Sequence, residues 1–258
     1  MSSISNSSGT AYEALLPRPR ISAPDSVVVT LLVGVQRFVV HESALIYHSG
    51  LFRTALSKKF KDPENEELDV QDVDPDTFEV FVHWLYYQQL PRKDGNDDKA
   101  VVDTFYSHYS GDAEFYPFTK LYVFAVEYDV AGLCRDIIDL LFHLTSDLGG
   151  DLAGGEAIAH AFNNLKETGS MCRLLVDLQC RFDNPHDVQY DRYTCVEFLQ
   201  AVWERYVRIT CSGTMQIDDD LELCDYHDHP TEGERIACEK ERRICEKEKR
   251  AREKALRE

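Results

Sequence analysis

The 258-residue sequence has no run of about 18 apolar residues, which is the length that a membrane-spanning helix requires. Its beginning, MSSISNSSGT, has neither the basic nor the apolar region of a secretory signal peptide. We therefore expect an intracellular protein of the cytoplasm or nucleus. There the 8 cysteines should stay reduced, and those in helical contexts are interpreted as small buried hydrophobic residues.

Motifs for covalent catalysis and nucleotide binding are also missing. The sequence contains no Gly-x-Ser-x-Gly around a nucleophilic serine and no Gly-rich loop of the kind that cradles phosphates. A catalytic site would need a nucleophile, an adjacent base and a third group that orients the base. The histidines and serines of the stretch FVVHESALIYHSGLFRTAL (residues 38–56) do not meet this requirement, so we predict no catalytic residue and no enzyme.

Basic residues are scarce, with 28 Lys and Arg against 46 Asp and Glu, and the net charge is −18. Residues 232–258 contain 10 of the basic and 8 of the acidic residues, which leaves the rest of the chain with a charge of −20. A surface this acidic repels phosphate backbones and anionic lipid. Direct binding to nucleic acid or to a membrane is therefore disfavoured.

Short apolar runs near the N-terminus predict a small β-sheet. Residues 1–24 are rich in Ser and contain three prolines, so we expect a disordered N-terminal segment. Two β-branched runs, 27–33 and 37–40, flank Gly34 and predict a hairpin. A third short strand is predicted at 68–70, where apolar and acidic residues alternate.

Helical signals occupy most of the remaining chain. Asp74 as N-cap and Pro75 at the first helical position predict a helix start. The segment 88–115 has no sustained periodicity and is predicted to be a long exposed loop. Further helices are predicted near 118–125, 133–144, 153–166, 171–181 and 192–209. The apolar stripe predicted for the last of these consists of Val196, Leu199, Trp203 and Tyr206.

The chain from about residue 231 is almost wholly charged. Its Glu-to-Arg pairs at i, i+4 are Glu239/Arg243, Glu246/Arg250, Glu248/Arg252 and Glu253/Arg257. Such pairs contribute about 0.2–0.5 kcal/mol each and favour a solvated helix. A coiled coil stays open as the alternative, on a thin apolar stripe of Ala237, Ile244 and Ala251.

A resemblance to a known family is carried by four blocks in order: VTLLVG, FVVHESALIYHSGLFRTAL, ELDVQDVDPDTFEVFVHWLYYQQL and KLYVFAVEYDVAGLCRDIIDLLF. Over residues 27 to about 145 the chain resembles the BTB/POZ domain, of the kind common in filamentous fungi. The resemblance implies an α+β fold, in which a short β-sheet has helices around it and an all-helical C-terminal extension follows. The expected divisions are 1–24, disordered; 25–148, BTB/POZ domain; 149–212, helical extension; 213–230, acidic loop with Cys and His; and 231–258, charged helical tail.

The resemblance gives His41 a structural role. The positions that match the fold signature of the family are His41, Leu45, Ser49 and Phe52. By resemblance, His41 orients the first helix through a hydrogen bond, Ser49 caps the next helix and Phe52 fills the core.

The function that the resemblance implies is a non-enzymatic protein–protein interaction module. It would mediate homo- or hetero-oligomerisation, and self-association is the expected partnership. The predicted contact residues are Leu45, Tyr47, Leu51 and Tyr86. Two alternatives stay open: a substrate adaptor for a cullin-type E3 ubiquitin ligase, with the cullin scaffold docked on the 75–89 helix and the long loop, and a transcriptional regulator that acts through a partner.

A second chemical candidate is the stretch LCDYHDHPTEGERIAC, residues 223–238. The candidate metal ligands in it are Cys224, His227, His229 and Cys238. Two thiolates and two imidazoles suit tetrahedral zinc, although the spacing C-x2-H-x-H-x8-C is not that of a standard finger. Two interpretations stay open: no cofactor, with a polar loop before a helix, or one structural zinc ion. In the second, Asp225 and Asp228 would accept hydrogen bonds from the ligands.

Overall fold

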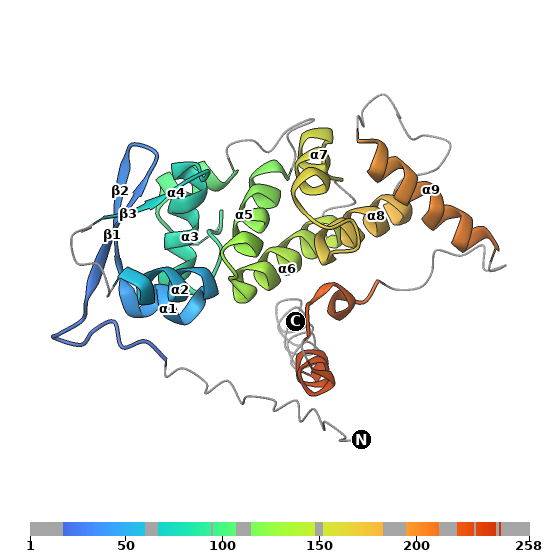
Figure 1. The fold of residues 1–258 in the computed structure, drawn as a ribbon. Coiled ribbons are helices and arrows are strands. Elements are labelled where there is room, and N and C mark those ends of the chain that lie inside the picture. The colour runs from blue at the N-terminus through green and yellow to red at the C-terminus, as the bar shows by residue number, and fades with distance from the viewer. Residues whose placement is uncertain are drawn as a thin grey trace, which may run out of the picture.

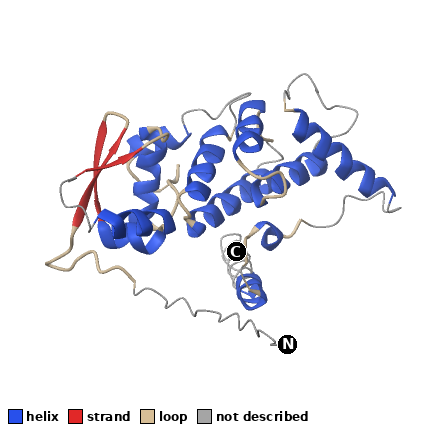
Figure 2. Cartoon of the chain, in the orientation of Figure 1, coloured by secondary structure: helices blue, strands red, loops and turns tan. Residues whose placement is uncertain are grey.

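The computed structural model describes residues 18–59, 67–93, 95–106, 115–147, 152–182, 195–211, 221–229, 231–240 and 243. Most of the predicted disordered segment and the charged pairs beyond residue 243 lie outside these ranges. A small three-stranded sheet stands at one end, and the rest of the described chain is mainly helical (Figures 1 and 2). Within the described ranges, no helix combines the length and the apolar character needed to cross a membrane.

The sheet begins with the predicted hairpin. Strands β1 (Val28–Val33) and β2 (Gln36–His41) are antiparallel and turn through Gly34, whose φ of 58° favours glycine. Strand β3 (Glu67–Val70) pairs in parallel with β1, so the strand order is β2-β1-β3. The strand residues that are buried in the core are Leu31, Val33, Val40 and Val70.

Helices α1 (Glu42–His48), α2 (Gly50–Lys59) and α3 (Pro75–Tyr87) lie beside the sheet, and α5 (Tyr116–Glu127) packs against α3 on the side away from the sheet (Figure 1). The core that they share is strongly aromatic. Its rings, which approach one another to centroid distances between 4.3 and 6.2 Å, belong to Phe52, Phe78, Phe81, Phe124 and Tyr128.

The start of α3 is where the sequence predicts it. The Asp74 carboxylate accepts a hydrogen bond from the Thr77 N–H at 3.0 Å, and the Lys120 ammonium of α5 lies 2.8 Å from the same carboxylate. Pro75 occupies the first helical position, where no amide hydrogen is needed. The prediction of this helix start is confirmed.

The segment 88–115 is not entirely a loop, so this prediction was wrong in part. Residues Lys99–Tyr106 form helix α4, which begins where the Asp98 carboxylate accepts the Ala100 N–H at 2.8 Å. Val101 and Phe105 are one turn apart and are buried. The helix is only 8 residues long, so its apolar residues span about two turns and give no sustained periodic signal. Residues 107–114 lie outside the described ranges.

The C-terminal region is helical. It consists of α6 (Ala131–Asp147), α7 (Gly155–Asn164), α8 (Ser170–Phe182), α9 (Val196–Cys211) and the 3₁₀ helix η3 (Leu223–Tyr226). Helix α7 contacts α5, and α8 contacts α6, α7, α9 and η3. The chain thus has the expected α+β region followed by a helical extension.

The apolar stripe predicted for α9 was wrong in part, because Leu199 and Tyr206 are partly buried against the core but the other two residues are exposed. Val196 and Trp203 are each 68% exposed, whereas Phe198 and Val202 are buried. The Phe198 ring meets the Phe162 ring of α7 at a centroid distance of 5.6 Å. Both sets of residues have helical spacing, so the contacts of α9 with α7 and α8 decide which face is buried most deeply.

Candidate metal centre and interaction surface

His41 lies at the junction of β2 and α1, and its partner is a residue of α3. Its backbone N–H donates to the Tyr86 hydroxyl oxygen at 3.1 Å, and its Nδ1 lies 2.9 Å from the same oxygen. Because that oxygen already accepts from the amide, its own proton is available to Nδ1. The His41 side chain makes no capping hydrogen bond to α1. His41 was expected to orient the first helix through a hydrogen bond, but the hydrogen bonds of its amide and Nδ1 join it to Tyr86 of α3.

Ser49 and Phe52 hold the turn between α1 and α2. The Ser49 Oγ accepts the Phe52 N–H at 3.1 Å, as an N-cap does, and donates to the Tyr128 carbonyl oxygen at 2.6 Å. The Phe52 side chain is buried, with its ring centroid 5.1 Å from that of Tyr128. The Ser49 hydroxyl thus donates to one backbone group and accepts from another, which indicates a structural role for this side chain.

Of the four predicted contact residues, Leu45 does not fit that role. It is completely buried at 0% exposure, so its side chain cannot meet a partner, and this prediction was wrong. The spacing of apolar residues in a 7-residue helix does not tell the core face from the outer face. Tyr47 and Tyr86 are half-buried, and Leu51 at the start of α2 is 45% exposed.

Sequence reasoning missed three exposed valines near the same junction. Val28 of β1 and Val39 of β2 lie on the outer face of the sheet, and the carbonyl of Val27 accepts the Glu42 N–H of α1 at 3.0 Å. The alternation of buried and exposed residues along a strand is the signal that could have found them. We call the β1–α1 surface the set Val27, Val28, Val39, Tyr47 and Leu51.

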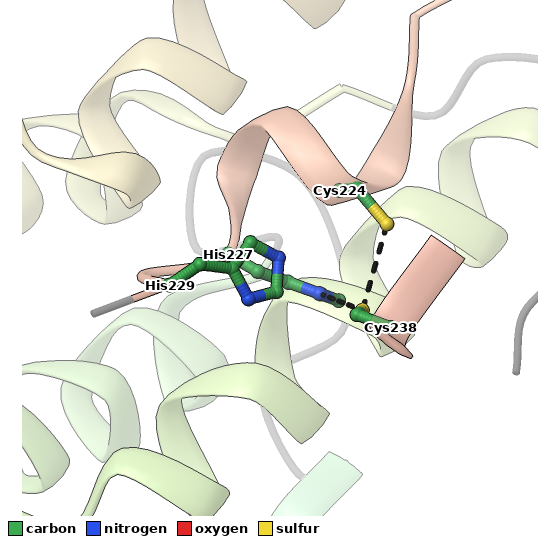
Figure 3. Close-up of side chains that lie close together, drawn as sticks. All are labelled: Cys224, His227, His229 and Cys238. Carbon is green, nitrogen blue, oxygen red and sulfur yellow. Dashed lines mark hydrogen bonds between the residues drawn. The ribbon is translucent and has the colours of Figure 1, made fainter. Parts of the chain in front are cut away.

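The structure brings together all four residues that the sequence predicts as metal ligands (Figure 3). Cys224 lies in η3, His227 and His229 follow it, and Cys238 comes from the helix of residues 232–240. The ligand-type atoms of all four lie within 4.8 Å of one another. The Cys238 Sγ is 3.5 Å from the Cys224 Sγ and 3.3 Å from the His227 Nδ1.

His227 is oriented by a carboxylate from another part of the fold. Its Nε2 lies 2.7 Å from the Asp139 Oδ1 of α6, and its side chain is only 3% exposed. The carboxylate can only accept when ionised, so it favours the tautomer with the proton on Nε2. The lone pair of Nδ1 then faces the Cys238 Sγ.

The role predicted for Asp225 and Asp228 falls instead to Asp139. The Asp225 carboxylate pairs with Arg235 at 2.7 Å, and the Asp228 carboxylate accepts the Ser170 hydroxyl at 3.1 Å. That prediction was therefore wrong. Asp139 is 88 residues from its histidine in the chain, and only the packing of α6 against η3 brings the two together.

His229 has an unusual environment for a polar ring. Both ring nitrogens are buried, and neither has a hydrogen-bond partner among the described residues. Its ring lies edge to face with that of His227, at a centroid distance of 5.7 Å. Burial, and after it the neighbouring His227, lowers the pKa of His229, which favours the neutral ring with a free lone pair. A buried nitrogen without a partner costs free energy.

The segment around η3 is fixed to α8 and α9 by polar contacts. The Tyr226 hydroxyl donates to one oxygen of Asp177 at 2.7 Å, and the other oxygen accepts from the Arg205 Nε at 2.6 Å. Arg173 donates to the Asp225 carbonyl oxygen at 2.8 Å. Burial, together with the Asp177 charge, raises the pKa of Tyr226, so the phenol keeps the proton that it donates.

Comparison with known proteins concerns the N-terminal part of the chain. A comparison with curated proteins finds no significant match. A family model, that of the BTB/POZ domain, matches residues 24–107. The match covers the sheet and helices α1 to α4, and it ends before α5 and the Cys/His cluster.

Proposed function

This chain contains a BTB/POZ domain, which is a protein–protein interaction module, and from that premise we propose a non-enzymatic protein that associates with a second copy of itself through the β1–α1 surface. The sequence resemblance supports self-association, because in that family the first strand and first helix commonly build a homodimer. In this chain, the residues in contact with the second copy would be those of the β1–α1 surface.

The observation that carries the proposal is the exposure of Val27, Val28 and Val39, which lies between 50% and 63%. Single exposed apolar residues are ordinary, but neighbouring ones mark interaction sites. Val28 and Val39 share the outer face of two paired strands, and Val27 is hydrogen-bonded to the first residue of α1. Covering these side chains would release about 25 cal/mol per Å² of apolar surface.

Light scattering on the purified full chain tests this proposal. We expect a mass above the 29.6 kDa of one chain, and we expect the double variant Val28→Asp with Leu51→Asp to shift it to the monomer. Val35→Asp is the matched control, because Val35 is 94% exposed at the hairpin turn and outside the surface. A monomeric wild type, or a double variant that associates as the wild type does, would contradict self-association.

The second candidate function is that of an adaptor for a cullin-type ubiquitin ligase. The observation in its favour is Tyr87 at the end of α3, which is 64% exposed and whose ring is tilted against that of His83 at a centroid distance of 4.7 Å. Phe105 of α4 is buried, so it would not contact the scaffold. We expect Tyr87→Ala to lose a co-purifying cullin and Trp203→Ala on exposed α9 to keep it; if no cullin co-purifies with the wild type, this candidate fails.

The Cys/His cluster supports a structural role in either case. A set of four protein ligands fills a tetrahedral coordination sphere and leaves no position for water or substrate. An enzyme of the zinc hydrolase type needs such an open position. The cluster is therefore compatible with a non-enzymatic protein.

A further inference from the structure

We propose that Cys224, His227, His229 and Cys238 bind a structural zinc ion, and that this ion holds the helix of residues 232–240 against the rest of the protein. The site lies outside the BTB/POZ match and does not depend on self-association.

The spacing of the ligand atoms fits a tetrahedron around zinc. Zn–S bonds of about 2.3 Å and Zn–N bonds of about 2.0–2.1 Å place two sulfurs about 3.8 Å apart and a sulfur and a nitrogen about 3.6 Å apart. The corresponding distances here are 3.5 Å between the two Sγ atoms and 3.3 Å between the Cys238 Sγ and the His227 Nδ1. Small outward shifts would therefore admit the ion.

The two histidines supply the nitrogens that zinc requires. Asp139 favours the proton on Nε2 of His227 and so directs the Nδ1 lone pair at the cluster, an arrangement common for zinc-bound histidines. His229 brings buried nitrogens without a hydrogen-bond partner in the described structure, and zinc would give one of them a partner. Without the ion, no interaction among the described residues offsets the free-energy cost of burying the His229 nitrogens.

The helix of residues 232–240 has little else to hold it. Most of its side chains are exposed, including Ile236 at 58%. Its ion pair to the protein joins Arg235 to Asp225 near the surface, and such pairs add little stability. Cys238 is thus the residue through which an ion could tie the helix down.

A disulfide explains the cluster less well. Neither cysteine forms a disulfide, and their Sγ atoms are 3.5 Å apart, whereas a disulfide bond is about 2.05 Å long. A disulfide would also leave both histidines unused. Thiolate and imidazole ligands in a closed tetrahedral set are typical of zinc, and the two thiolates would neutralise its charge.

Elemental analysis of the full chain, purified under reducing conditions without chelator, tests the ligands. We expect about one zinc per chain in the wild type and a loss of it in Cys238→Ser and His229→Ala. Cys211→Ser and His143→Ala change an exposed cysteine and an exposed histidine outside the cluster, so they should keep the ion. A wild type without stoichiometric zinc, or cluster variants that keep it in full, would overturn the proposal.

The absorption spectrum of the cobalt-substituted wild type identifies the metal ligands without any variant, so it remains informative even if a variant fails to fold. With Co²⁺ as the probe, we expect the intense visible bands of a tetrahedral ion and a thiolate-to-metal charge-transfer band of the strength given by two sulfurs. Weak bands of an octahedral ion, with no charge transfer, would overturn the site.

Limited proteolysis tests the role of the ion. We expect a chelator to speed trypsin cleavage after Arg235 and Lys240 and to expose Cys238 to alkylation by iodoacetamide. Cleavage after Arg92, which lies in an exposed loop of the BTB/POZ domain, should not change. If zinc leaves and the rates at Arg235 and Lys240 stay the same, the ion does not hold the helix.

Discussion

Between β1 and α5 the core consists largely of packed aromatic rings, whereas residues 221–240 combine a short buried apolar segment at η3 with polar contacts. The Phe81 ring centroid lies 4.8 Å from that of Phe124 and 5.5 Å from that of Phe78, and all three residues are buried. Around η3, Leu223 and Tyr226 are also buried in the hydrophobic core, and polar contacts such as the hydrogen bond of Tyr226 with Asp177 and the Cys/His cluster are added to this packing. Burial of apolar surface stabilises the first region without a ligand. The hydrogen bonds of the second region are of small net value, and we infer that residues 232–240, most of which are exposed, depend on an ion.

The largest expected effect comes from emptying the aromatic core. Phe81→Ala should lower the free energy of unfolding by about 3–5 kcal/mol, since it removes a ring buried among other rings. This is a large share of the roughly 5–15 kcal/mol that stabilises a typical domain. Urea unfolding followed by circular dichroism measures it, with Val35→Ala as a control that should change less than about 0.5 kcal/mol. A loss below about 1 kcal/mol would contradict the role of the rings.

A smaller effect is expected from the polar ties of the C-terminal region. Tyr226→Phe keeps the ring and removes the hydroxyl that donates to the Asp177 carboxylate, so it should cost about 1.5–3 kcal/mol in urea unfolding of the zinc-loaded chain. Tyr87→Phe is the control, because Tyr87 is 64% exposed. Equal stabilities of the two variants would mean that this hydrogen bond does not anchor η3.

The cap of α3 should make stability depend on pH. Although partial burial opposes it, hydrogen bonds from Lys120 and Thr77 lower the pKa of Asp74 below its ordinary value in the unfolded chain. Its stabilisation is therefore fully present above about pH 4 and is lost as the pH falls through the folded-state pKa. Asp74→Ala should cost about 0.5–2 kcal/mol at neutral pH and progressively less in acid.

Unfolding curves at several pH values measure the effect of this cap. Asp103→Ala on exposed α4 is the control, and its difference from the wild type should stay small throughout. A cost of Asp74→Ala that stays constant down to the lowest pH would show that the cap does not depend on the ionised carboxylate.

The smallest effect is expected at the surface of the C-terminal helix. Arg235→Ala removes an exposed ion pair with Asp225 and should leave both the zinc content and the unfolding midpoint unchanged within error. Elemental analysis and urea unfolding check this. Loss of zinc in this variant would mean that the ion pair, rather than the ion, positions the helix.

The features that could be predicted from the sequence have their signals close together in the chain. The hairpin depends on Gly34 between two β-branched runs, and the start of α3 depends on Asp74 and Pro75. The Cys/His cluster was predicted as a set because all four residues lie between 224 and 238.

The features that could not be predicted depend on residues far apart in the chain. Helix α4 is held by the contact of Phe105 with Phe118 at a centroid distance of 4.9 Å. The buried face of α9 is set by α7 and α8, and the partner of His227 is Asp139 on α6. No local pattern contains these pairings, because tertiary packing creates them.

Hydrogen exchange on the zinc-loaded and the chelator-treated chain tests the account most directly, since it reads both regions in one measurement. We predict that the chelator abolishes protection of the amides in residues 232–240, weakens it around η3 and leaves that of α3 and α5 unchanged. Equal protection of residues 232–240 with and without the ion, after confirmed loss of the metal, would contradict the claim that one region needs only its core and the other needs zinc.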